Sequence, residues 1–341
     1  MAMIDNRGVS LDKSMRQSFA PQNLELFMAS DIFKRFREGS SEPSGEGEDE
    51  SGISTAYRRI REAEILAAID RLPALPLIVQ RILGSLGDEK TDARSLDALI
   101  SQDMVIAGRV LKLVNSPFYI QRNTVTSIQQ AVALIGQRSL RSLVVAVSSR
   151  DIMSADISAY GFEGNGLWLN SMVTAALARR AAELVGVGRD VCDEAFVAGL
   201  LRDVGMLVLG PIMKAKGLVM DGTTSRGIDI IDRERSALGF DHGWVGERVA
   251  GKWKLAESLT LAIGRHHRVP SSLDDHQRRL LALLRVAERV AYNARAGVGV
   301  NHPFDTAIDA PLLRAAGMTT DGFKTLVAEA PNIIETARGE L

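Results

Sequence analysis

AFVAGLLRDVGMLVLG, residues 195–210, is almost wholly apolar, yet it carries Arg202 and Asp203 side by side at its centre. Its large apolar residues recur at helical spacing, which predicts one helix with a wide buried face. A charge on such a face must be paired or must serve a site, because removing an ion from water costs several kcal/mol. The residues that set the spacing are Phe196, Leu200, Val204, Leu207 and Val208.

The same helical period runs through almost every segment after residue 55, and alternating, strand-like runs are very few. LPALP at 72–76 predicts that a helix ends at Leu72, because proline lacks an amide donor and restricts the residue before it. Ser127 and Gln130 form a capping box that begins another helix, and Gly136 suits its end. We therefore expect an all-α fold.

Composition limits the classes of function. The chain has 341 residues, of which 46% are hydrophobic and 24% charged, so it can bury a sizeable core. Its formal net charge of -1 offers no broad basic field, and specific nucleic-acid binding is not expected. A single cysteine, no signal-peptide pattern at the N-terminus and no long uncharged apolar run predict a cytoplasmic protein without a membrane span.

The N-terminal part differs in composition from the rest. Residues 40–52 hold five acidic and no basic residues, which is typical of a flexible linker. Upstream, residues 24–38 place apolar side chains on one helical face and end in basic ones. This amphipathic helix could dock on the body of the protein, bind a partner or lie on a membrane surface.

The histidines are the candidate chemistry. His242, His266, His267 and His276 fall within 35 residues on consecutive predicted helices, whereas the fifth, His302, stands apart. A hydrolytic metal site needs neutral imidazoles and carboxylates, with an open position for water. Common phosphate-loop, dinucleotide, hydrolase-elbow and zinc-ribbon motifs do not occur in the sequence. Possible ligands are Asp203, His242, His266, His267 and Glu288.

Several of these histidines have another interpretation. His242 follows Asp241 at a predicted helix start, where capping or packing is as good a role as ligation. His266 and His267 are adjacent, so on a helix they point about 100° apart and cannot both face one ion unless the helix ends there. We expect His276 and His302 to be exposed.

Four motifs resemble, in order and spacing, the HDOD family, the HD-related output domain of bacterial signalling proteins. The match covers about residues 65–270 and extends to about 295. As a run of motifs it is specific, although any single motif would be weak. The motifs are LPALPLIVQRIL at 72–83, LDALISQDMVIAGRVLKLVNSPFY at 96–119, SIQQAVALIGQRSLRSLVV at 127–145 and LWLNSMVTAALAR at 167–179.

The resemblance extends to the wider HD superfamily of metal phosphohydrolases and implies a degenerate site. Catalytic members have histidine at the position of Asn170, a His-Asp pair at Arg202-Asp203 and aspartate at Glu288. Of those four positions only Asp203 keeps its ligand. Arginine has no lone pair to give, and an asparagine carbonyl is a weak substitute for imidazole. The resemblance therefore implies no metal and no cofactor; if an ion binds, its ligands are Asp203, His242, His266 and His267.

Arg202 has two interpretations from the sequence. It could replace the charge of a missing metal by pairing with Asp203 or Glu288. It could instead lie at the helix edge, with its stem packed and its guanidinium in water.

We expect a non-catalytic regulatory protein that acts through contacts with signalling proteins, without a cofactor. One alternative is a metal-dependent phosphohydrolase of a nucleotide or cyclic dinucleotide. Another is a sensor that binds a small ligand or nucleotide in the old cleft, with Arg202 on phosphate. The oligomeric state is open. The expected division is a mobile segment at 1–54, an HDOD domain at 55–300 (a helical bundle at 55–155 and an HD-like half at 156–300) and a helical extension at 301–341.

Overall fold

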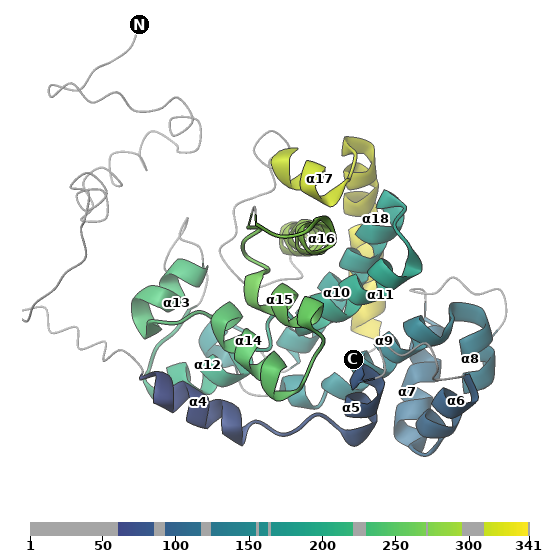
Figure 1. Cartoon of the computed structure of the whole chain (residues 1–341), viewed down its shortest axis with the longest axis horizontal. Helices are drawn as coiled ribbons and strands as arrows, with labels where there is room; N and C mark the ends of the chain where they lie inside the picture. The colour runs from purple at the N-terminus through teal and green to yellow at the C-terminus, as the bar shows by residue number, and fades with distance from the viewer. Residues whose placement is uncertain are drawn as a thin grey trace, which may run out of the picture. The chain divides into compact units, whose positions relative to one another are not determined.

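The described part of the chain is built from helices alone (Figure 1), which confirms the all-α class. Every described residue lies in one compact unit, Tyr57–Leu341. The helix expected at 24–38, the acidic stretch 40–52 and His302 fall outside the described residues. The computed structural model describes residues 61–84, 93–116, 124–154, 157–162, 165–220, 230–270, 272–294 and 310–339.

Among the first six described helices, two boundaries that the sequence predicts are found in the structure. The first of them ends at Arg71 with Leu72 as its C-cap, directly before the proline pair. The hydroxyl of Ser127 accepts a hydrogen bond from the Gln130 amide, and Gly136 ends that helix with a φ of 82°, which confirms the capping box. The helices are α4 (Glu62–Arg71), α5 (Leu77–Gly84), α6 (Ala93–Ser101), α7 (Met104–Val114), α8 (Ile128–Ile135) and α9 (Gln137–Ser149).

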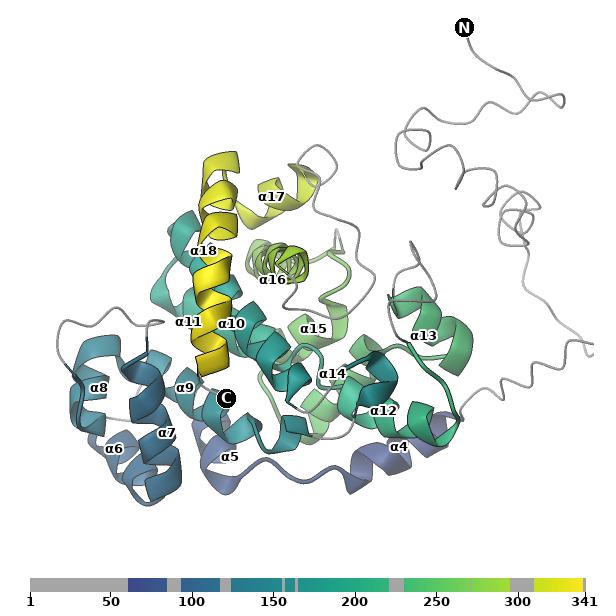
Figure 2. The same cartoon turned by 180° about the vertical axis from the view of Figure 1, so that it is seen from behind.

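In the second half, α10 (Gly166–Val185) packs against α11, α16 and α18, and α14 packs against α12 and α15 (Figures 1 and 2). Two short 3-10 turns, Ile152–Ser154 and Ser158–Tyr160, connect α9 to α10. The other helices are α11 (Arg189–Leu201), α12 (Met206–Ala215), α13 (Ile230–Leu238), α14 (His242–Lys252), α15 (Glu257–Arg265), α16 (Asp275–Asn293), α17 (Ala310–Ala316) and α18 (Thr320–Gly339).

The apolar stretch 195–210 is two helices, and the expectation of one helix is wrong. α11 ends at Leu201, residues 202–205 form a turn, and α12 begins at Met206. The turn lies against α14: a Cβ added to Gly205 would stand 2.0 Å from the carbonyl oxygen of His242. This close backbone approach requires glycine and places the charged pair in a turn inside the core.

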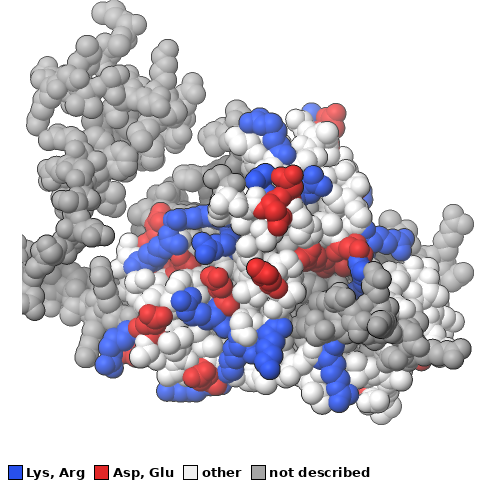
Figure 3. Space-filling view, in the orientation of Figure 1, with Lys and Arg blue, Asp and Glu red and all other residues white. Residues whose placement is uncertain are grey.

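The stretch Arg189–Ala215 is long and apolar enough to cross a membrane by composition, but 89% of its most apolar window is buried in the fold. Burial of this kind is what a core helix shows, so the test is weak support for a span. The cytoplasmic location stays a prediction. On the face in Figure 3, acidic and basic side chains are interspersed over the described residues.

Candidate metal centre

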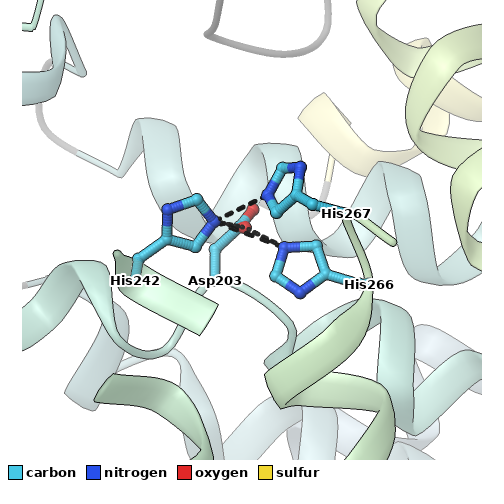
Figure 4. A group of neighbouring side chains, drawn as sticks. All are labelled: Asp203, His242, His266 and His267. Carbon is cyan, nitrogen blue, oxygen red and sulfur yellow. Dashed lines mark hydrogen bonds and ion pairs between the residues drawn. The ribbon is translucent and has the colours of Figure 1, made fainter. Parts of the chain in front are cut away.

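Four predicted ligands from three parts of the chain meet at one point (Figure 4). Asp203 comes from the turn between α11 and α12, and His242 is the first residue of α14. His266 caps the C-terminus of α15, and His267 follows it. The side chains of Asp203, His242 and His266 are at most 5% exposed, and His267 is half-buried.

The ligand atoms all lie within 4.8 Å of one another, and four of their separations are close to those around one ion. The Nε2 atom of His242 lies 2.9 Å from Nε2 of His267 and 3.3 Å from Nε2 of His266. Oδ1 of Asp203 lies 3.5 Å from the His242 Nε2 atom and 3.4 Å from that of His266. In a tetrahedral zinc site, metal–ligand bonds of about 2.0–2.1 Å put neighbouring ligand atoms about 3.3 Å apart.

The end of α15 explains how two adjacent histidines serve one point. The helix ends at Arg265, so the 100° separation expected on a continuous helix does not apply to His266 and His267. At the other corner, Asp241 is the N-cap of α14 through the Trp244 amide, which leaves the fully buried His242 ring free of a capping role.

A buried carboxylate that the sequence analysis missed orients His242. Glu234 on α13 is wholly buried and lies 2.8 Å from Nδ1 of His242. It also accepts hydrogen bonds from the His242 amide at 2.8 Å and the Tyr160 hydroxyl at 2.6 Å. A signal was available, because Glu234 shares the buried face of α13 with Ile230, Ile231 and Leu238. A charge on an apolar helix face raises the same question as Arg202.

These contacts fix which ring nitrogens face the centre. A carboxylate holds Nδ1 of His242, and the Nδ1–H of His266 donates to the carbonyl of Ile263 at 2.8 Å. Each ring therefore turns Nε2 toward its neighbours. When both rings are neutral, their lone pairs face each other, so the centre needs a positive charge, either a metal ion or a proton.

The pKa shifts of the histidines apply to the site without a metal, in which a proton supplies the positive charge. Burial alone would lower the pKa of His242, but Glu234 and Asp203 outweigh it and raise that pKa well above its usual value. Burial, followed by the charges of His266 and His242, lowers the pKa of His267 well below its usual value. Without a metal, an imidazolium at His242 donates to a neutral His267.

Arg202 occupies the other side of Asp203. Its Nη2 atom lies 2.7 Å from Asp203 Oδ2 and also donates to the side-chain oxygen of Asn170, while Nη1 donates to the carbonyl of Gly199 at 2.8 Å. The residue is 2% exposed, so the interpretation as an edge arginine with its guanidinium in water is wrong. Burial would raise the pKa of Asp203, but Arg202 and the two histidines hold it well below its usual value.

The structure does not bring Glu288 to the centre. Glu288 is half-buried on α16 and contributes no atom to the group of ligands. Arg285, one turn earlier on that helix, carries the charge that reaches His267 and helps to lower its pKa. His276 is exposed, as expected, and pairs with Glu194 at 2.9 Å.

The family model of the HDOD domain matches residues 72–269, and the chain belongs to this family. It is 26% identical over 218 residues to an uncharacterised protein of Treponema pallidum (strain Nichols), a match that covers 63% of the chain and 41% of that protein. The matched part thus spans about two fifths of this relative's length.

Three crystal structures share the fold. An HDOD domain protein with unknown function from Geobacter sulfurreducens has a TM-score of 0.63 at 23% identity, over 82% of this chain and 95% of the other. A proposed phosphohydrolase from Shewanella amazonensis SB2B has a TM-score of 0.62 at 23% identity, over 82% of this chain and 98% of the other. A proposed signal transduction protein from Marinobacter aquaeolei VT8 has a TM-score of 0.62 at 20% identity, over 82% of this chain and 65% of the other. At such identities the likeness shows the fold alone.

Proposed function

We propose that this HDOD protein is a signalling domain that acts by binding rather than by catalysis, and that Asp203, His242, His266 and His267 hold one transition-metal ion. The convergence of the four ligand atoms carries the proposal. Imidazole and carboxylate together suit zinc or iron. The proposal departs from the expectation of a metal-free site, because the converging ring nitrogens and carboxylate offer lone pairs that a metal ion would satisfy.

Arg202 supports the non-catalytic part of the proposal. Two-metal hydrolysis requires a second ion beside the first. At this site the guanidinium of Arg202 already neutralises Asp203 Oδ2, and its charge would repel a second cation. Four protein ligands also fill a tetrahedral shell, whereas catalytic zinc sites keep a position for water.

The remaining part of the proposal concerns partners. The family is one of output domains, and a protein of the same fold is described as a signal transduction protein. A domain with a closed metal site would act through its surface, by contacts with other signalling proteins in the cytoplasm. The metal would then hold α14 and α15 to the turn before α12.

Elemental analysis of protein purified without chelator tests the metal. We expect close to one zinc or iron ion per chain, lost in His267→Gln and retained in His276→Gln, whose exposed ring is the matched control. His267 is chosen because it is half-buried, so its replacement disturbs packing least. A folded, metal-free wild-type protein that also fails to take up added zinc would contradict the proposal and leave a proton-held cluster.

An assay with bis(p-nitrophenyl) phosphate tests the absence of catalysis. The alternative function is a metal-dependent phosphohydrolase, favoured by the ligand cluster and by the description of one structural neighbour. We expect no turnover above free metal with zinc, iron or manganese. Turnover that disappears in His267→Gln and persists in His276→Gln would overturn the non-catalytic proposal.

A further inference from the structure

A cavity lies away from the metal centre, among α7, α9, α10, α11 and α18. Its volume is about 640 Å³, within the range of about 300–1,000 Å³ for small-molecule sites. Figure 2 shows α18 lying across α10 and α11 on this side of the molecule. Six apolar side chains line it: Leu113, Leu143, Met172, Ala176, Phe196 and Ile333. The rest of the lining is polar or charged and comes from α10 and α18: Arg179, Arg180, Glu183, Glu329, Asn332, Glu335 and Thr336.

One ion pair at the rim joins α18 to α10. Nε of Arg180 lies 2.6 Å from Oε2 of Glu329, and Nη2 lies 2.9 Å from Oε1, which is the bidentate geometry of a guanidinium on a carboxylate. Both side chains are about one third exposed, at 35% and 36%. The hydrogen bonds from Arg180 also lower the pKa of Glu329 below its usual value, so the pair is ionised.

The neighbouring arginine is committed elsewhere. Arg179 pairs with the buried carboxylate of Asp193 at 2.6 Å and with Glu183 on its own helix. Arg180 also contacts Glu183, with Nη1 3.3 Å from Oε2, but its bidentate partner Glu329 belongs to a separate, C-terminal helix.

α18 has a weak point just beyond the ion pair. Pro331 lies inside the helix, where it removes one backbone hydrogen bond. The part of α18 after this proline covers the cavity with Asn332, Ile333, Glu335 and Thr336. Its last turn is attached to α7 by a hydrogen bond from Lys112 Nζ to the carbonyl of Gly339, at 3.2 Å.

We propose that this cavity binds a small amphipathic carboxylate of the fatty-acid type, whose carboxylate replaces that of Glu329 on Arg180 while its apolar chain enters the cavity. The ligand presents to Arg180 the same chemical group that Glu329 presents, so it competes for the same bidentate contact. The ligand gains free energy of binding that Glu329 does not, because its acyl chain leaves water and is buried against the apolar walls.

Ligand binding then weakens the attachment of α18. Displacement of Glu329 removes the ion pair that ties α18 to α10, and the segment after Pro331 becomes easier to open. The coupling is reciprocal: if ligand binding loosens α18, then loosening α18 strengthens ligand binding by the same free energy. The metal centre plays no part in this site, so the two proposals stand or fall separately.

Calorimetric titration of the full chain with decanoate, below its micelle concentration, tests the site. Decyltrimethylammonium has the same chain with the opposite charge and is the ligand control. We expect decanoate to bind, Arg180→Gln to weaken it about tenfold, and Glu329→Gln to strengthen it about threefold, since the competitor is lost. Lys324→Gln, which removes an exposed pair with Asp321 at the start of the same helix, outside the cavity, is the matched control and should change nothing.

Hydrogen exchange reports the coupling. Decanoate should speed exchange of amides in residues 332–339 and leave α4 unchanged. No decanoate binding at millimolar concentration would overturn the proposal, and so would equal binding of decyltrimethylammonium or unchanged affinity in both Arg180→Gln and Glu329→Gln. The opposite signs expected for these two variants keep the test valid if one of them folds poorly.

Discussion

The two oxygens of the Asp203 carboxylate have opposite surroundings. Oδ2 faces Arg202, whose guanidinium is covalently part of the chain and also bonds to Asn170 and Gly199. Oδ1 faces the imidazoles of His242 and His266, which have no fixed positive charge. Arg202 neutralises one side, whereas on our proposal the other side takes a metal ion from solvent. The comparison teaches that the two oxygens of one carboxylate can be balanced in different ways, one by an arginine of the chain and one by a bound ion.

Removing the guanidinium of Arg202 should have the largest effect on stability. Arg202→Met leaves the buried Asp203 carboxylate without its partner, which should lower the free energy of unfolding by about 3–5 kcal/mol. Urea unfolding in chelator measures the change. Arg338→Met, which removes an exposed pair, is the control and should cost less than about 1 kcal/mol. Equal stabilities for the two variants would mean that Arg202 is not needed to neutralise the buried carboxylate of Asp203.

The second prediction concerns the turn at residues 202–205, which carries Arg202 and Asp203 and packs against α14. Gly205→Ala places a Cβ 2.0 Å from the His242 carbonyl oxygen and 2.8 Å from the Gly246 nitrogen. Neither is a flexible side-chain end, so we expect a loss of about 3 kcal/mol in thermal or urea unfolding. Gly251→Ala on α14, where a Cβ meets nothing within 4 Å, should be neutral or slightly stabilising. A tolerated Gly205→Ala would show that the close approach is dispensable.

The smallest expected effect concerns the side of Asp203 that faces the histidines. Glu234→Gln keeps the size of the side chain but weakens its hold on Nδ1 of His242, so zinc affinity should fall about 10–100-fold. Competition with a fluorescent zinc chelator measures this affinity. Glu257→Gln, at the exposed start of α15, is the matched control. If both variants bind zinc like the wild-type chain, Glu234 supports only the packing of α13.

Helix boundaries were the most predictable part of the fold. Leu72, Ser127 and Gly136 mark helix ends through the chemistry of the residues beside them, which needs no knowledge of the rest of the chain. The boundary inside 195–210 was missed for the opposite reason. The apolar period continues across residues 202–205, and what distinguishes this turn is the backbone of α14, which lies against Gly205.

The site divides in the same way. The sequence by itself determined which residue types were available: two carboxylates, three imidazoles and an arginine at a position where the family resemblance implies a ligand. Only the tertiary structure decided that Asp203, His242, His266 and His267 converge, that Glu288 stays away and that Glu234 enters. Helical period and capping depend on neighbours within a few residues, whereas convergence depends on how the helices cross and end. That geometry is set by packing across the whole core.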